Sequence, residues 1–166
     1  MSVAFWIVAL VALQRLGELA LSNRNTKRLL AQGSQEFGAA HYPLIVALHG
    51  GWLATLLFAS PDIAAVNWLL IGAFGALQCG RIWVLASLGP YWTTRIIHVP
   101  EAPLVHSGPY RWLRHPNYVI VSGEILILPL AFGMTKTAIG FSLANAAILY
   151  WRIRVENEVL ATRKIS

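Results

Sequence analysis

The amino-acid sequence predicts an all-α integral membrane protein, built as one domain over residues 1–166 from about five transmembrane helices. Hydrophobic residues make up 57% of the chain and charged residues only 12%, whereas soluble domains are about 25% charged. The mean hydropathy is +0.58. This composition is typical of a membrane protein, because charged side chains are costly in lipid whereas apolar side chains can be exposed to it.

Five apolar stretches divide the chain. A helix needs about 20 residues to cross the hydrocarbon core, and a backbone without water must satisfy its own hydrogen bonds, which favours helices. Gly133 and its neighbours predict a tight connection, so that the last two helices form an antiparallel hairpin. The predicted spans are residues 3–21, 41–59, 63–88, 118–132 and 137–151.

The distribution of basic residues predicts the orientation of the bundle. The net charge is +6, and the basic residues gather after the first, third and fifth spans, which favours a membrane protein over a nucleic-acid-binding one. Basic segments mark the cytoplasmic face, so we expect the N-terminus outside and the C-terminus in the cytoplasm. The same face carries the long connections, residues 22–40 and 89–117, where functional groups concentrate. The basic residues that follow the three spans are Arg24, Lys27, Arg28, Arg95, Arg111, Arg114, Arg152, Arg154, Arg163 and Lys164.

Four charged side chains lie within the predicted spans. Arg15 and Glu18 are three residues apart and share a helix face, while Arg81 and Glu124 lie in the third and fourth spans. Intramembrane charges face the bundle interior or a wet cavity. They predict either interhelical ion pairs or a polar entrance to a cavity. His49 in the second span could be a ligand, but a lone histidine is more often hydrogen-bonded to a neighbouring helix, which is the expectation here.

The segment before the fourth span, residues 104–118, reads LVHSGPYRWLRHPNY. Gly108-Pro109 indicates a turn, and Pro116 suits the first turn of a helix. The free N–H groups at such a helix start favour a carboxylate. An interfacial belt of aromatic residues and arginines is the alternative interpretation. The polar or aromatic members of the segment are His106, Tyr110, Arg111, Trp112, Arg114, His115, Asn117 and Tyr118.

The C-terminal tail, YWRIRVENEVLATRKIS, is predicted to form a short helix. Arg152 and Glu156 are then four residues apart on one face, and Arg154 and Glu158 on another. One pair would face a site and the other the solvent, or both would be surface ion pairs of small weight. No histidine set has the spacing of a metal site, so no metal is expected.

These two segments together resemble the isoprenylcysteine carboxyl methyltransferase family, whose members are membrane enzymes that use S-adenosylmethionine. The resemblance rests on GPYRWLRHPNY, on the helical hairpin that follows, and on a tail of the form R-x-x-x-E-x-x-x-L. It covers roughly Arg95 to the C-terminus, and short bacterial members are similar in character to the whole chain. It implies a cofactor pocket at the cytoplasmic face.

The resemblance also implies residue roles. Glu156 would hold the amino group of the donor and Arg152 would face the acceptor, with Leu160 fixing the register. The family usually has two adjacent acids here, whereas Asn157 follows Glu156 in this chain and the second acid is Glu158. The Arg154/Glu158 register therefore stays open. The other donor-binding residues implied are Ala102, Pro103, Leu104, Val105, Tyr110, His115, Pro116, Asn117 and Tyr118.

The expected function is methyl transfer from S-adenosylmethionine to a lipophilic or lipidated acceptor at the membrane, with carboxyl O-methylation as in isoprenylcysteine enzymes. A lipidic polyketide hydroxyl and a phospholipid amine are alternative acceptors. From a different class, a small non-enzymatic transporter or assembly protein is the alternative. Membrane lipids are expected partners and nucleic acid is not, while the sequence leaves the acceptor's identity and the oligomeric state open.

Overall fold

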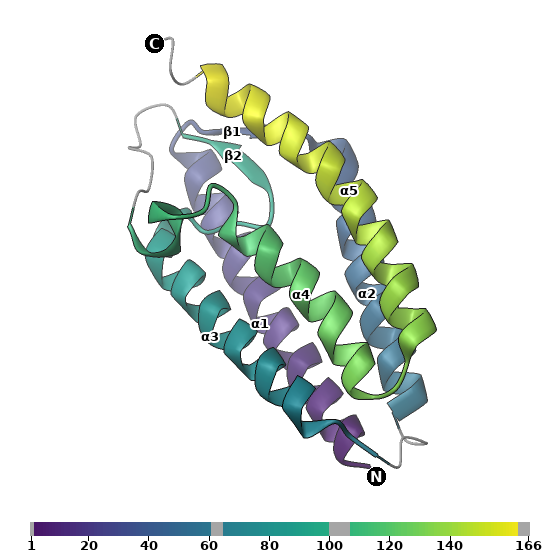
Figure 1. The fold of residues 1–166 in the computed structure, drawn as a ribbon. Helices are drawn as coiled ribbons and strands as arrows, with labels where there is room; N and C mark the ends of the chain where they lie inside the picture. The colour runs from purple at the N-terminus through teal and green to yellow at the C-terminus, as the bar shows by residue number, and fades with distance from the viewer. Residues whose placement is uncertain (1, 61–64, 100–106, 163–166) are drawn as a thin grey trace.

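The chain folds into a bundle of long helices, seen in Figure 1. The computed structural model describes residues 2–60, 65–99 and 107–162, and five α-helices lie within these ranges. The predicted all-α fold of five helices is confirmed. The described residues also contain three short 3₁₀ turns, which are η1 (Ala39–His41), η3 (Gly89–Tyr91) and η4 (Gly108–Arg111). The helices are α1 (Val3–Ala31), α2 (Tyr42–Ala59), α3 (Trp68–Leu88), α4 (Pro116–Ala131) and α5 (Thr135–Thr162).

Local sequence signals set the helix starts. Ser2 caps α1 by accepting from the Phe5 N–H at 3.1 Å. Asn67 caps α3 in the same way through two backbone N–H groups at 3.1 and 3.2 Å. Pro116 opens α4, where its missing N–H costs nothing.

Two helices continue beyond their predicted ends. Helix α1 runs to Ala31, ten residues past the predicted limit at residue 21. Helix α5 continues without a break to Thr162, so the expected short C-terminal helix is its far end. No glycine or proline stands between Trp151 and Thr162 to stop it. The predicted hairpin is present, with Gly133 at φ +72° between α4 and α5.

Three of the helices in the described part of the chain are long and apolar enough to cross a membrane. They are Val3–Ala31, Tyr42–Ala59 and Trp68–Tyr91, whereas Pro116–Ala131 is apolar but shorter. Figure 1 shows α4 and α5 lying beside these three helices. That α4 and α5 also cross the bilayer stays a prediction.

Burial in the bundle is the reverse of the pattern in a soluble protein. Glu124 is 3% exposed and Arg81 6%, whereas Leu69 is 84% exposed and Phe58 82%. A soluble protein keeps charged groups outside and covers large apolar patches. An apolar exterior around a charged interior fits a lipid surrounding.

The buried charges form one ion network that joins α1, α3 and α4. Arg15 contacts Glu18 at 2.7 Å and Glu124 at 2.8 Å. Arg81 contacts the same two carboxylates at 2.6 and 3.1 Å. Two cations and two anions balance, so no charge in the network is left uncompensated. The interhelical ion-pair interpretation therefore describes these four residues.

Two glutamines complete the network, and the sequence analysis missed both of them. Gln14 donates to Glu18 at 3.0 Å and to Gln78 at 2.9 Å, and Gln78 donates to Glu124 at 2.7 Å. His49 makes no hydrogen bond to this set among the described residues. Its Nδ1 is 2.8 Å from the Ile45 carbonyl one turn earlier on its own helix, which corrects the expectation of a bond to a neighbouring helix.

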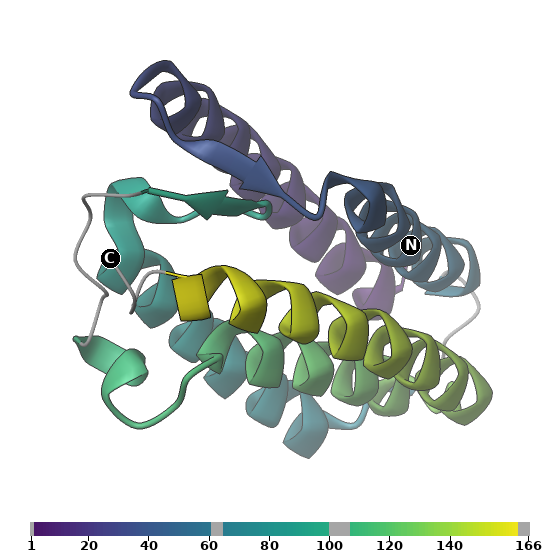
Figure 2. The same ribbon diagram turned by 90° about the horizontal axis from the view of Figure 1, so that it is seen from above.

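A two-stranded antiparallel ribbon, which the sequence analysis did not predict, ties the two long connections together. Strand β1 (Gln35–Phe37) pairs with β2 (Ile96–His98), and Gln35 lies opposite His98. Figures 1 and 2 show the ribbon at the end of the bundle where α5 terminates. The ribbon fixes the segment after α3 close to the end of α5.

The network yields a stability prediction. The variant Arg81→Met leaves Glu18 and Glu124 with one guanidinium between them, so we expect a loss of about 3–5 kcal/mol in unfolding free energy. Thermal unfolding in detergent measures it. Arg154→Met, which removes an exposed arginine, is the control and should change stability little. Equal losses in both variants would contradict a structural role of the network.

Candidate functional site

The start of α4 and the far half of α5 meet in a cluster of polar side chains. The Tyr118 hydroxyl donates to Oε2 of Glu156, and Nε of Arg152 donates to the same hydroxyl at 2.7 Å. The Arg152 guanidinium carbon also lies 5.6 Å from the centre of the Tyr118 ring. One phenol thus links the two charged residues that stand four apart on α5.

A backbone carbonyl from the segment after α3 fixes the position of Arg152. Its Nη2 donates to the Thr94 carbonyl at 2.7 Å, and the residue as a whole is buried. Thr94 is held in turn by Ser22 of α1, whose hydroxyl accepts from the Thr94 N–H at 2.8 Å and lies 2.7 Å from its hydroxyl. Three chain segments therefore set the direction of one guanidinium.

His115 covers the other side of the phenol. Its ring stacks on the Tyr118 ring with centres 5.3 Å apart and planes at 17°. Its Nδ1 lies 3.7 Å from Oε2 of Glu156. His115 is the N-cap residue of α4, yet its side chain makes no capping hydrogen bond. Pro116 has no N–H, and the Tyr118 N–H donates to the His115 carbonyl at 3.1 Å. Of the first three residues of α4, Asn117 therefore has the N–H without a partner among the described residues.

Asn117 and Tyr110 complete the described part of the cluster. The side-chain oxygen Oδ1 of Asn117 is buried without a hydrogen-bond partner among the described residues, so it can still accept a hydrogen bond. Burial raises the pKa of the Tyr110 phenol, and the Glu156 carboxylate raises it further. Tyr110 is therefore neutral near pH 7 and keeps its hydroxyl proton.

The structure distinguishes between the two tail registers by position. Arg152 and Glu156 face α4, whereas Arg154 and Glu158 are exposed. Arg154 lies over the ring of Tyr150, 4.8 Å from its centre. The contacts favour Arg152 and Glu156 as the inward pair.

The other predicted site residues fall into three groups. Pro116 is fully buried at the start of α4, and Arg111 and Arg114 are exposed. The side chain of Leu160 lies outside the described part of the chain. So do the predicted adenosyl-lining residues and one polar neighbour, namely Ala102, Pro103, Leu104, Val105 and His106.

The sequence analysis missed the contribution of the segment after α3. Thr94 contacts Arg152 through its backbone, so no side-chain pattern could indicate it. The next residue, Arg95, is charged and could have been noticed. Its Nη1 pairs with Oε1 of Glu36 at 2.7 Å, and its guanidinium carbon lies 4.1 Å from the centre of the Tyr42 ring. An arginine and a glutamate in two long connections on the same face were the available signal.

The cluster offers complementary groups to a zwitterionic amino acid. Oε1 of Glu156 makes no hydrogen bond within the described residues, and with Asn117 Oδ1 it can accept from an ammonium group. The Asn117 N–H, at the positive end of the α4 dipole, suits a carboxylate. The methionine end of S-adenosylmethionine carries these two groups, so the residues present fit it.

Comparison with known proteins places the cluster in a described family. The model of the isoprenylcysteine carboxyl methyltransferase (ICMT) family matches residues 68–162, which contain α3, α4, α5 and the whole Tyr118–Arg152–Glu156 cluster. No solved structure matches the chain significantly.

Two curated bacterial proteins are similar over nearly the whole length. One, from Bacillus subtilis, is described as the uncharacterized protein YpbQ. It is 39% identical over 164 residues, covering 94% of this chain and 96% of that protein. The other, an uncharacterized protein of Haemophilus influenzae, is 26% identical over 156 residues, covering 89% and 88%.

The close approach of Gly108 to α3 predicts how η4, which carries Tyr110, is held in place. A Cβ at Gly108 would lie 2.1 Å from Ser87 Oγ and 3.1 Å from Trp83 Nε1, and φ is +59°. We expect Gly108→Ala to cost about 1–3 kcal/mol more than Gly133→Ala, because overpacking adds to backbone strain. Gly133 is the matched control, with φ +72° and open space around its Cβ position. Denaturant unfolding measures both, and equal costs would contradict a tight contact at Gly108.

Proposed function

Because the chain belongs to the isoprenylcysteine carboxyl methyltransferase family, we propose that it transfers a methyl group from S-adenosylmethionine to a lipophilic acceptor in the membrane. The observation that carries the proposal is the cluster in which Tyr118 joins Arg152 to Glu156 beside an uncapped helix start. It offers anion-binding and cation-binding groups within one small volume.

The donor's amino-acid end is assigned to α4 and α5. Glu156 and the Asn117 side chain accept from the ammonium group, and the Asn117 N–H at the positive end of α4 binds the carboxylate. His115 stacks on Tyr118 and narrows the site on one side. The family resemblance assigns the adenosyl moiety to Ala102, Pro103, Leu104 and Val105.

The acceptor is assigned to Arg152. Nε and Nη2 are held by Tyr118 and Thr94, while Nη1 makes no hydrogen bond within the described residues and can bind an acceptor oxygen. A guanidinium with two donors fixed in this way is already oriented, so binding costs little further entropy. This favours an acceptor that carries a carboxylate.

Methyl transfer from an activated donor requires mainly that the protein position the donor and the acceptor. When bound, S-adenosylmethionine supplies a methyl carbon already activated by its positive sulfur. Arg152 aligns the acceptor oxygen, Glu156 and Asn117 hold the amino-acid end, and the surrounding helices exclude water. A carboxylate acceptor is ionised at neutral pH and needs no base.

Other acceptors would need a further group. The hydroxyl of a lipidic polyketide has to lose its proton, and His115 is a candidate base in the described cluster. A phospholipid amine is protonated near neutral pH and would also have to lose a proton before it could attack the methyl carbon. The topology proposed for the reaction has the N-terminus outside and the C-terminus in the cytoplasm, where the donor is found.

Donor binding gives the first test. We expect the detergent-purified protein to bind S-adenosylhomocysteine in isothermal titration calorimetry. Glu156→Gln should weaken binding about 10–100-fold, because a hydrogen bond to a charged group contributes about 1.5–3 kcal/mol. Glu158→Gln removes the same charge from the exposed face of the same helix and should leave affinity unchanged. A transporter or assembly protein would bind neither the product nor the donor.

The acceptor role of Arg152 has a separate readout. Arg152→Lys keeps the charge but loses the oriented fork, so we expect near-normal binding of S-adenosylhomocysteine and a transfer rate at least about tenfold lower. The rate is measured with S-adenosylmethionine tritiated in its methyl group, as the tritium transferred to lipids extracted from the cells that produce the protein. Arg154→Lys is the control. Unchanged transfer in Arg152→Lys would remove Arg152 from the acceptor site.

A further inference from the structure

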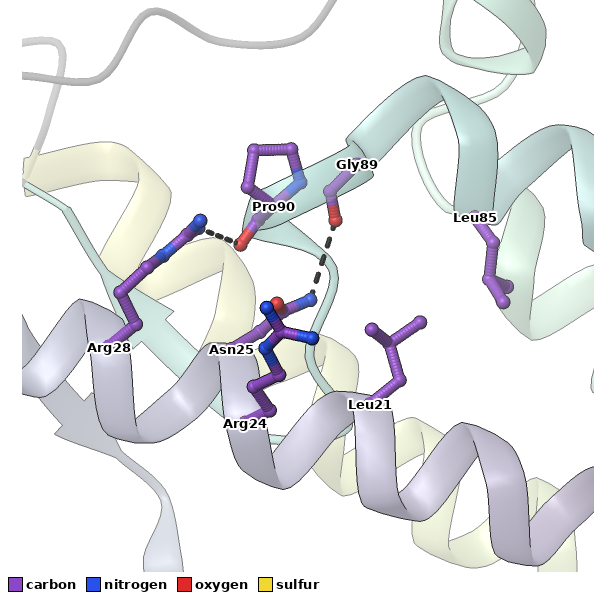
Figure 3. A pocket seen from close by; sticks show the side chains of 7 residues that line it. All are labelled: Leu21, Arg24, Asn25, Arg28, Leu85, Gly89 and Pro90. Atoms are coloured by element: carbon purple, nitrogen blue, oxygen red, sulfur yellow. Dashed lines mark hydrogen bonds between the residues drawn. The ribbon is translucent and has the colours of Figure 1, made fainter.

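A second polar site lies between the end of α1 and the end of α3, and none of its lining residues belongs to the Tyr118–Arg152–Glu156 cluster. It is a pocket of about 550 Å³ that Figure 3 shows from close by. Arginine side chains of α1 and backbone carbonyls of η3 form its polar part, and leucines form the rest. The lining residues are Leu21, Arg24, Asn25, Arg28, Leu85, Gly89 and Pro90.

Two arginines lie on the polar side of the pocket. The guanidinium of Arg28 is hydrogen-bonded to the protein, and that of Arg24 is not, within the described residues. Nη2 of Arg28 donates to the Pro90 carbonyl at 2.6 Å, and Asn25 donates to the Gly89 and Trp92 carbonyls at 3.4 and 2.8 Å. Arg24 makes no hydrogen bond or ion pair with any residue that the structure describes. Its charge has no protein partner at the pocket wall, which favours an anionic ligand.

The apolar side of the pocket continues toward the membrane. Leu21 and Leu85 lie where the apolar parts of α1 and α3 end, and Leu21 is exposed. One turn deeper, Ile82 is exposed on α3, and a Cβ at Gly17 of α1 would meet nothing within 4 Å. A ligand with its anion at the arginines can therefore lay an alkyl chain along this surface.

From this geometry we infer that the pocket binds the phosphate of an anionic phospholipid, with its acyl chain descending between α1 and α3. The phosphate lies against Arg24 and Arg28 at the membrane boundary, where arginine forks bind phosphate oxygens bidentately. The apolar wall beneath the arginines favours a lipid over free phosphate. The site goes beyond the proposed methyl transfer, because its residues are separate from the Tyr118–Arg152–Glu156 cluster.

Native mass spectrometry of the detergent-purified protein tests the inference. Phosphatidylglycerol and phosphatidylcholine with identical acyl chains are titrated separately. We expect tighter retention of phosphatidylglycerol, and a loss of about tenfold in its affinity in Arg24→Gln, because a charge-assisted hydrogen bond disappears. Arg24 has no hydrogen bond or ion pair to lose within the described residues, so the variant should unfold at nearly the same temperature as the parent.

The matched control is Lys27→Gln, which removes the same charge from the same helix but does not line the pocket. Its affinity for phosphatidylglycerol should stay unchanged. Equal losses in both variants would mean diffuse attraction to a basic surface and would overturn the proposal, as would no loss in Arg24→Gln. Displacement of phosphatidylglycerol by millimolar inorganic phosphate, with no preference over phosphatidylcholine, would assign the pocket to free phosphate instead.

Discussion

The buried ion network of Arg15, Glu18, Arg81 and Glu124 is the constraint on which the bundle depends. Each guanidinium contacts both carboxylates, so α1, α3 and α4 cannot slide or rotate independently without separating opposite charges in an apolar surrounding. Apolar packing alone would permit several helix rotations, because lipid and side chains are equally apolar. The network selects one of them.

Helix α4 carries this constraint to the polar cluster. Glu124 is less than two turns from Tyr118 along the same helix, and Ser22 is one turn beyond Glu18 on α1. Fixing α1 and α4 in the core therefore also fixes Ser22, and through it Thr94 and Arg152, at the end of the bundle. Helices α1 and α4 therefore contribute to both polar groups, the ion network inside the bundle and the cluster at its end.

The sequence was sufficient to predict those features that depend on residues close together in the chain. Apolar run length predicted the helices, and four-residue spacing put Arg152 and Glu156 on one face. The sequence did not predict contacts in which the partner is far away along the chain or is a backbone group. Nothing in the residues around Thr94 shows that its carbonyl accepts from Arg152, and strands as short as β1 and β2 carry too few residues for a period to be visible. Helix α5 extends beyond its predicted end because the polar tail contains no glycine or proline to end it, and polarity alone does not stop a helix.

On the predicted topology, in which α5 crosses the bilayer, its unbroken course would couple bilayer thickness to the proposed methyl transfer. Its 28 residues extend about 42 Å at 1.5 Å per residue, more than the ~30 Å of a hydrocarbon layer. With no hinge to absorb it, a change in tilt is passed along the rod and grows toward the end that bears Arg152 and Glu156. A thinner or thicker membrane would therefore shift the distance between these groups and the start of α4.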